Sequence, residues 1–188
     1  QNLFTVIKTL SLILLIILGF SIGANSEVIK LNFTDLWAGS FSTERFNSVS
    51  ELVGGSAWLV AFMVAGGAMV GSLFSADAWN NVTFASADFE DPKKTIAKGL
   101  VYGSALVCLL YLLTNMAYLS ILPLKGEADG INSYARGIMF ATQDRLGAAA
   151  LETVLGGIGA LVMAVFIMIS TFGCNNGIIL AGGRLFQA

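Results

Sequence analysis

Residues 3–23 read LFTVIKTLSLILLIILGFSIG, and this run decides the fold class. It carries one charge, Lys8, and has the length of about 20 apolar residues that a helix needs to cross a membrane. It lacks the basic start and small-residue cleavage site of a signal peptide, so a membrane-spanning helix at the start of a fragment is the better interpretation. Further apolar runs follow near residues 56–86, 98–122 and 147–183.

Composition supports a membrane protein. Of 188 residues, 56% are hydrophobic and 12% are charged, whereas soluble domains have about 25% charged residues. Backbone groups in lipid need partners within their own segment, and none of the runs alternates as a barrel strand does. We therefore expect an all-α integral membrane protein with helices at about residues 2–24, 56–86, 98–122 and 150–183.

Two details refine this expectation. The last apolar run, residues 147–183, is too long for one span, so its first part is predicted to be a separate interfacial helix. Glycines also recur four residues apart, a spacing that lets membrane helices approach closely. The three pairs are Gly67 with Gly71, Gly99 with Gly103, and Gly173 with Gly177.

The connections predict a multi-pass topology, which we place in the plasma membrane. Within loop 85–98, Asp91-Pro92 is typical of a helix N-cap followed by proline at the first helical position. The loop also holds Lys93, Lys94 and Lys98, and positive charge favours the cytoplasmic side. Loops 24–55 and 123–147 then face outside. Loop 24–55 also contains Asn32-Phe33-Thr34, a glycosylation sequon of a kind that often occurs by chance.

The second apolar run is interrupted by polar residues at 75–81, SADAWNN. An Asp at membrane depth, here Asp77, costs roughly 2.5–3.5 kcal/mol and usually faces a cavity or a partner. Irregular backbone at this depth is typical of a transporter's substrate site. The alternative is that Asp77 lies at an interface where the helix simply ends.

Two other positions allow alternatives. Lys8 is either a lysine that extends toward the cytoplasmic interface or a buried ammonium that replaces a bound cation. Residues 170–177, STFGCNNG, form a polar patch that includes Cys174. This patch either packs against another helix, which the spacing favours, or lines a permeation path.

The sequence indicates no enzyme chemistry. It has no His, no nucleophile elbow, no phosphate-binding loop and no metal-ligand cluster. We expect no catalytic residues, no cofactor and no metal. The net charge of −2 gives no reason to expect nucleic acid as a partner.

Four stretches resemble the L-type branch of the amino acid–polyamine–organocation superfamily, in the family's order. Residues 4–19 resemble its fifth helix, 72–100 its sixth helix and following loop, 110–120 its seventh and 170–186 its eighth. The resemblance implies helices five to eight of a LeuT-type, twelve-helix inverted-repeat transporter fold. Helices one to four and nine to twelve of the same transporter would then be partners of this part, together with the lipid bilayer.

The resemblance also implies residue roles. In the family, backbone carbonyls of the unwound segment bind the substrate's α-amino group, here at Phe74, Ser75 and Asp77. Asn80 matches an asparagine beside the site. Lys8 matches a lysine that occupies the place of a sodium ion in related carriers, and Cys174 stands where a serine is frequent, which would weaken a hydrogen bond to Lys8.

The chain departs from the family pattern at two more positions. Ala78 replaces a usual glycine and Ala76 a common aromatic residue, which puts the flexibility and the gating of the break in doubt. The expected function is a secondary active amino acid transporter, a permease or exchanger, that works by alternating access. The alternative is a non-transporting membrane sensor or scaffold of the same fold.

Overall fold

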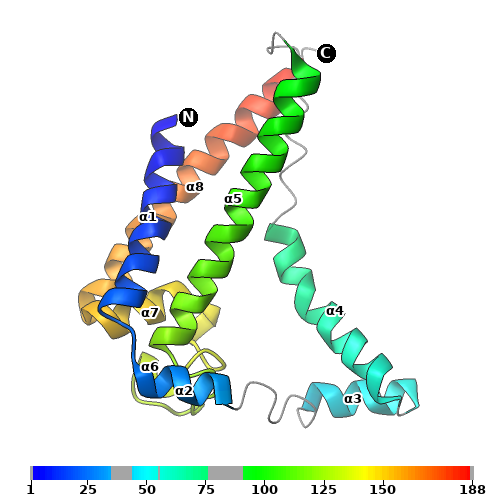
Figure 1. Cartoon of the computed structure of the whole chain (residues 1–188), viewed down its shortest axis with the longest axis vertical. Helices are drawn as coiled ribbons and strands as arrows, with labels where there is room; N and C mark the ends of the chain where they lie inside the picture. Colours follow the sequence, from blue (N-terminus) through cyan, green and yellow to red (C-terminus); the bar gives the residue numbers. More distant parts are fainter. Residues whose placement is uncertain (1, 35–43, 55, 76–90, 187–188) are drawn as a thin grey trace. The chain divides into compact units, whose positions relative to one another are not determined.

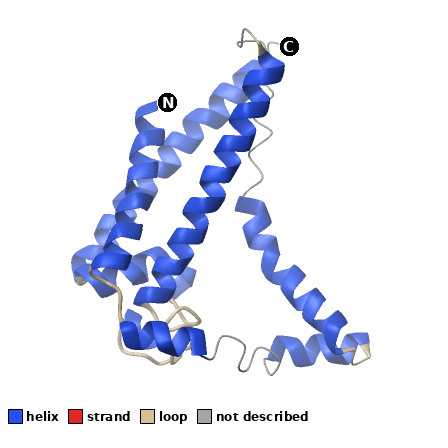
Figure 2. Cartoon of the chain, viewed as in Figure 1, coloured by secondary structure: helices blue, strands red, loops and turns tan. Residues whose placement is uncertain are grey.

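The computed structural model describes residues 2–34, 44–54, 56–75 and 91–186. The chain divides into two compact units, residues 1–34 with 82–188 and residues 35–81. Every regular element in the described residues is a helix and none is a strand (Figure 2). The predicted all-α fold is therefore confirmed.

The first unit contains most of the helices. Its elements are α1 (Asn2–Ser21), α2 (Ser26–Thr34), α5 (Pro92–Ile121), α6 (Ser133–Arg136), η2 (Thr142–Asp144), α7 (Leu146–Leu155) and α8 (Gly157–Leu185). The second unit contains α3 (Glu44–Val53) and α4 (Ala57–Ser75), which pack against each other.

Three helices among the described residues, α1, α5 and α8, are long and apolar enough to cross a membrane. The apolar part of α4, Ala57–Leu73, is shorter than these three. Three of the four predicted spans thus reach membrane length within the described ranges.

Within the first unit, α1 packs against both α5 and α8. Figure 1 shows α1 and α5 running in the same direction and α8 in the opposite one. The short helices α2, α6 and α7 gather where α1 and α5 finish, whereas α5 begins at the other end (Figure 1). Residues 24–34 and 123–147, the parts of the two long loops within the first unit, therefore share one end of the bundle, and Lys93, Lys94 and Lys98 lie toward the other.

The core of this unit lies at the loop end, where apolar side chains of α1, α5 and α7 meet. Leu15, Ala117 and Leu151 form one buried cluster, each at most 2% exposed. Ile121, Leu122, Ala149 and Ala150 form a second, and Tyr118 packs against both. Burial of these side chains holds the short helices onto the membrane-spanning ones.

The glycine that brings α1 and α5 together is Gly19, which belongs to none of the three predicted pairs. A Cβ on Gly19 would lie 2.7 Å from Ala117 Cβ, whereas a Cβ on Gly99 or Gly103 would meet no atom within 4 Å. The same open space surrounds Gly67 and Gly71. These two predicted pairs are therefore not packing contacts among the described residues.

Replacing Gly19 by Ala should destabilise the full-length protein by about 1–3 kcal/mol, because neither Cβ can move without shifting a helix. Gly99→Ala is the matched control, and it should stabilise α5 by about 0.5–1 kcal/mol because Ala is the better helix former. Thermal unfolding of the purified full-length variants in detergent measures both effects. Equal unfolding midpoints for the two variants would contradict the packing of α1 on α5.

Helix α5 begins at Pro92, as the Asp91-Pro92 pair predicts, and so starts before the membrane span that was predicted from residue 98. Proline suits the first helical position because it has no N–H to leave unpaired, and Asp91 occupies the N-cap position as the sequence indicates. The Asp91 side chain, however, makes no capping bond and lies 3.5 Å from Lys94 Nζ instead. The lysines that seemed to end the loop are part of the helix, where long side chains can reach the interface.

The opposite end of α5 is closed by α2. The carbonyl of Leu119 would accept a helical hydrogen bond from the N–H of residue 123, but that residue is Pro123, which has no N–H. Asn32 supplies the missing donor: its Nδ2 donates to Leu119 O at 2.8 Å and to Leu122 O at 2.9 Å. Its Oδ1 accepts from Leu124 N at 2.7 Å.

This arrangement also bears on the sequon at Asn32. The residue is 3% exposed, and its amide nitrogen already donates to two carbonyls. A glycan needs that nitrogen at the surface. In the folded chain Asn32 is a structural residue that fastens α2 to the end of α5.

Replacing Asn32 by Ala should destabilise the full-length protein by about 3 kcal/mol or more, because several buried polar groups each lose a partner worth about 1–3 kcal/mol. Asn115→Ala is the matched control, since Asn115 is exposed and, in the part of the chain that the structure describes, its side chain bonds Tyr111 O of its own helix alone. The fraction of protein that stays monodisperse after mild heating reports the difference. Equal stability of the two variants would refute the role of Asn32 as a clamp.

The long fourth apolar run is divided, as predicted, into α7 and α8. The division falls at Gly156, whose φ of +69° is a conformation that favours glycine. The following residues turn back onto α7 so closely that a Cβ on Gly159 would overlap the carbonyl of Leu151. The short α7 therefore lies against the start of α8 and leaves α8 as the membrane-spanning part.

Candidate functional site

The structure brings two predicted site residues together across α1 and α8. Lys8 Nζ donates a hydrogen bond to Cys174 Sγ at 3.4 Å. Lys8 is half-buried and Cys174 is exposed within this chain. A thiol sulfur is a weak acceptor, so the contact holds the ammonium less firmly than a hydroxyl would.

An aromatic contact and a glycine set the approach of the two helices at this point. Phe4 lies one turn before Lys8 on α1, and its ring centroid is 5.6 Å from that of Phe172. A Cβ on Gly173 would lie 2.8 Å from Phe4 Cβ and 3.6 Å from Lys8 Cε. The polar patch of α8 thus packs against α1, and Gly173 gives Lys8 room to reach Cys174.

The charge on Lys8 has no carboxylate partner among the residues that the structure describes. The neighbouring hydroxyls of α1 are engaged by backbone: Thr9 Oγ1 donates to Thr5 O, and Ser11 Oγ donates to Lys8 O. An ammonium in an apolar helix that is paired with a neutral thiol is costly to keep in a membrane. Such a group is suited to replacing a bound cation or to exchanging a proton.

The predicted substrate-binding residues fall at the end of the described part of α4. Phe74 and Ser75 are its last two residues. Asp77 and Asn80, together with the rest of the predicted interruption, lie outside the described residues. The break at 75–81 and the four substrate contacts stay predictions.

The loop end holds polar residues that the sequence did not single out. Ser133 Oγ donates to Glu152 Oε2 at 2.6 Å, and Arg136 Nε donates to Gly130 O at 2.8 Å. Arg136 also bonds Thr142 Oγ1. A 25-residue loop with charges at irregular spacing gives no periodic signal, so only its contacts reveal that it is ordered. Within the described ranges no three His, Cys, Asp or Glu residues gather as metal ligands would.

Together these features define a helical, multi-pass integral membrane protein in which a lysine of one membrane-length helix has a thiol, and no carboxylate among the described residues, as its partner. The chain belongs to the amino acid permease family, whose model matches residues 1–188. No solved structure matches it.

Several curated proteins are similar to the chain. It is 26% identical over 185 residues to b(0,+)-type amino acid transporter 1 of Rattus norvegicus, a match that covers 98% of this chain and 31% of that protein. It is 27% identical over 150 residues to the serine/threonine exchanger SteT of Bacillus subtilis, covering 80% and 30%. It is 25% identical over 192 residues to large neutral amino acids transporter small subunit 2 of Mus musculus, covering 100% and 30%.

The chain thus spans about a third or less of the length of these relatives. The names of the relatives are those of transporters and an exchanger, and none is that of an enzyme. They agree with the prediction, made from the missing catalytic set, that the chain is not an enzyme.

Proposed function

We propose that this chain is the middle part of a secondary active amino acid transporter, comprising helices five to eight of a twelve-helix fold. The family match over the whole chain supports this proposal. The observation that carries it is the contact of Lys8 with Cys174, which joins α1 to α8 through a charge at membrane depth.

In this proposal the substrate binds at the end of α4. Backbone carbonyls at Phe74, Ser75 and Asp77 receive the α-ammonium group, and Asn80 lies beside the site. The Asp77 carboxylate adds negative charge next to that ammonium. Helix ends that unwind at membrane depth are suited to this task because their carbonyls have no helical partner.

Lys8 and Cys174 provide the coupling element. A fixed ammonium between two helices does the work of a bound cation, and the Cys174 thiol is its acceptor on α8. Alternating access then exposes the substrate site to each side of the plasma membrane in turn. Loop 85–98 faces the cytoplasm, and loops 24–55 and 123–147 face outside.

Measuring binding and flux on one preparation tests this function against the sensor or scaffold alternative. Purified full-length protein is reconstituted into vesicles, and binding and uptake of labelled amino acids are followed with and without amino acid inside. A transporter should accumulate label, and an exchanger should do so only in preloaded vesicles. Saturable binding with flux no greater than that of protein-free vesicles would favour the alternative.

A further inference from the structure

The loop end of the first unit contains a cavity of about 370 Å³ that is lined by charged, polar and apolar residues. This volume lies within the range of about 300–1,000 Å³ that is typical of small-ligand sites. The charged residues that line it are two cations, Arg136 and Arg145, and one anion, Glu152. A smaller cavity of about 280 Å³ shares Asn132, Ser133 and Glu152 with it.

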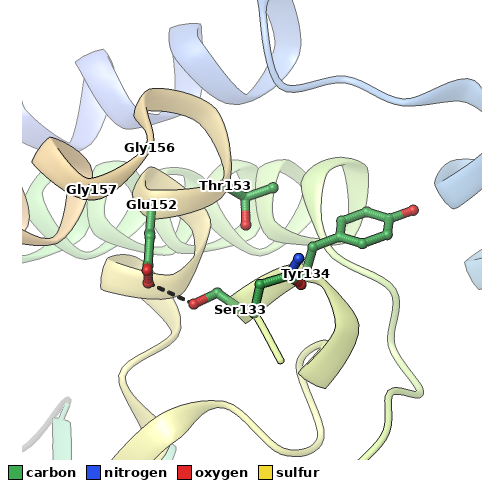
Figure 3. A pocket seen from close by; sticks show the side chains of 7 residues that line it. Ser133, Tyr134, Glu152, Thr153, Gly156 and Gly157 are labelled. Atoms are coloured by element: carbon green, nitrogen blue, oxygen red, sulfur yellow. Dashed lines mark hydrogen bonds between the residues drawn. The ribbon is translucent and has the colours of Figure 1, made fainter. Parts of the chain in front are cut away.

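The opposite charges in this cavity are not paired with each other. The described part of the chain contains no ion pair between Glu152 and either arginine. Glu152 instead accepts a hydrogen bond from Ser133 (Figure 3), and Arg136 bonds Gly130 O and Thr142. The exposed Arg145 makes no side-chain bond among the described residues.

Hydrogen bonds and helix packing order the backbone around the cavity. Asn132 caps α6 by accepting from Ala135 N at 2.7 Å, and Glu127 N donates to Ala135 O at 2.9 Å. Helix α6 packs on α7, and α7 packs on α8. Glu152, Arg136 and Arg145 thus line one cavity, with no ion pair among them in the described part of the chain.

The remaining wall is apolar and small. Ala148, Ala149 and Ala160 line it, and Ile131, whose side chain is 98% exposed, stands at its edge. A ligand that fits all these walls carries a carboxylate for the arginines, an ammonium for Glu152 and a modest apolar group for the alanines. That combination describes a free α-amino acid.

We infer that this cavity is a second binding site for zwitterionic amino acids, separate from the one at the end of α4. The inference rests on the proposed function for its substrate class. The cavity lies at the end of the first unit that holds residues 24–34 and 123–147, where substrate would meet the protein before or after crossing. Its charges attract both ends of a zwitterion and discriminate against molecules that carry one end alone.

A cysteine introduced at Ile131 in the full-length protein reports occupancy of the cavity. The rate at which a maleimide labels Ile131→Cys, above that of the parent protein, is measured with alanine, leucine or serine present. At ten times its Kd an amino acid leaves about one tenth of the sites free, so labelling should slow about tenfold. Propionate and ethylamine, which carry only one of the two charges, should give no protection.

Substitutions of charged residues test which of them the amino acid contacts in the cavity. Arg145→Gln and Glu152→Gln should each abolish protection, whereas Lys30→Gln and Glu127→Gln, exposed charges outside the cavity, should preserve it. In transport the two wall variants should raise KM several-fold and leave the maximal rate unchanged.

The inference is overturned if none of the three amino acids protects Ile131→Cys, if the cysteine cannot be labelled, or if propionate protects as well as alanine. The same measurement in an Asp77→Ala background separates the two sites. Protection that persists there supports the cavity, even if the protein proves unable to transport. Protection lost there would assign the effect to the site at α4 and leave the proposed function standing.

Discussion

Replacing Lys8 by Met should lower amino acid uptake by the full-length protein about tenfold or more, because hydrogen bonds of charged groups contribute about 1.5–3 kcal/mol. Methionine keeps much of the length of the side chain but removes the ammonium that reaches Cys174 Sγ at 3.4 Å. Without that charge, α1 and α8 lose their polar link at membrane depth. Phe4 and Phe172 would still hold the helices together, so the variant should fold.

Two controls distinguish coupling from folding in this experiment. Cys174→Ser keeps an acceptor for Lys8 and offers a stronger one, so its uptake should stay within about twofold of the parent. Lys94→Met removes a lysine whose side chain is 80% exposed, and it should leave uptake unchanged. Parental uptake by Lys8→Met, at equal amounts of protein in the membrane, would remove Lys8 from the mechanism.

Replacing Asp77 by Ala should also lower uptake about ten- to a hundredfold, since a charge-assisted bond to the substrate ammonium contributes about 1.5–3 kcal/mol. The change should not impair insertion, because a carboxylate at membrane depth costs roughly 2.5–3.5 kcal/mol and alanine does not. Uptake should therefore fall while the amount of inserted protein holds or rises. Initial rates over a range of substrate concentrations measure the effect.

Asp91→Ala is the matched control for Asp77→Ala. Asp91 lies outside the apolar part of the chain, and its one ion pair within the described ranges is with the exposed Lys94. Surface pairs of this kind contribute little. Its uptake should match that of the parent. Undiminished transport by Asp77→Ala would contradict the assignment of the substrate site to the end of α4.

The membrane-spanning helices could be predicted from the sequence because lipid imposes a simple rule. A run such as residues 3–23 must form a helix to satisfy its own backbone, whatever surrounds it. Helix α1 accordingly runs from Asn2 to Ser21. The division of the last apolar run was predictable for the same reason, since a run of that length exceeds one membrane crossing.

Features that depend on contacts distant in the sequence could not be predicted in this way. Asn32 bonds residues that lie 87 and 90 positions later, and nothing near it in the sequence marks it as the clamp of α5. Gly19 and Gly23 have the same four-residue spacing as the three predicted pairs. Spacing alone does not show which glycine makes a contact such as that of Gly19 with Ala117. The start of α5 at Pro92 was predicted by the Asp91-Pro92 pair, which is a local signal. The predicted membrane span began only at residue 98, because the lysines before it are not apolar, although a helix that leaves the membrane accommodates them.

The candidate site, too, could be predicted from the sequence only in part. Spacing alone left open whether Lys8 reaches toward an interface or serves as an internal cation, and the family resemblance pointed to Cys174 as its partner. The structure shows the contact and adds Phe4 and Gly173, which explain how the two side chains meet. The cavity at Glu152 had no signal in the sequence, because its charges come from separate short elements that only folding brings together.

The proposed binding of an amino acid at the end of α4 is tested most directly by a cysteine at Ser75. Labelling of Ser75→Cys in the reconstituted full-length protein is measured with a small thiol reagent, above the labelling of the parent protein. Ser56→Cys, at the start of α4, serves as the control. At ten times the Kd of a transported amino acid, labelling of Ser75→Cys should slow about tenfold, and labelling of Ser56→Cys should not change. Equal labelling of Ser75→Cys with and without substrate, in a preparation that transports it, would contradict the account.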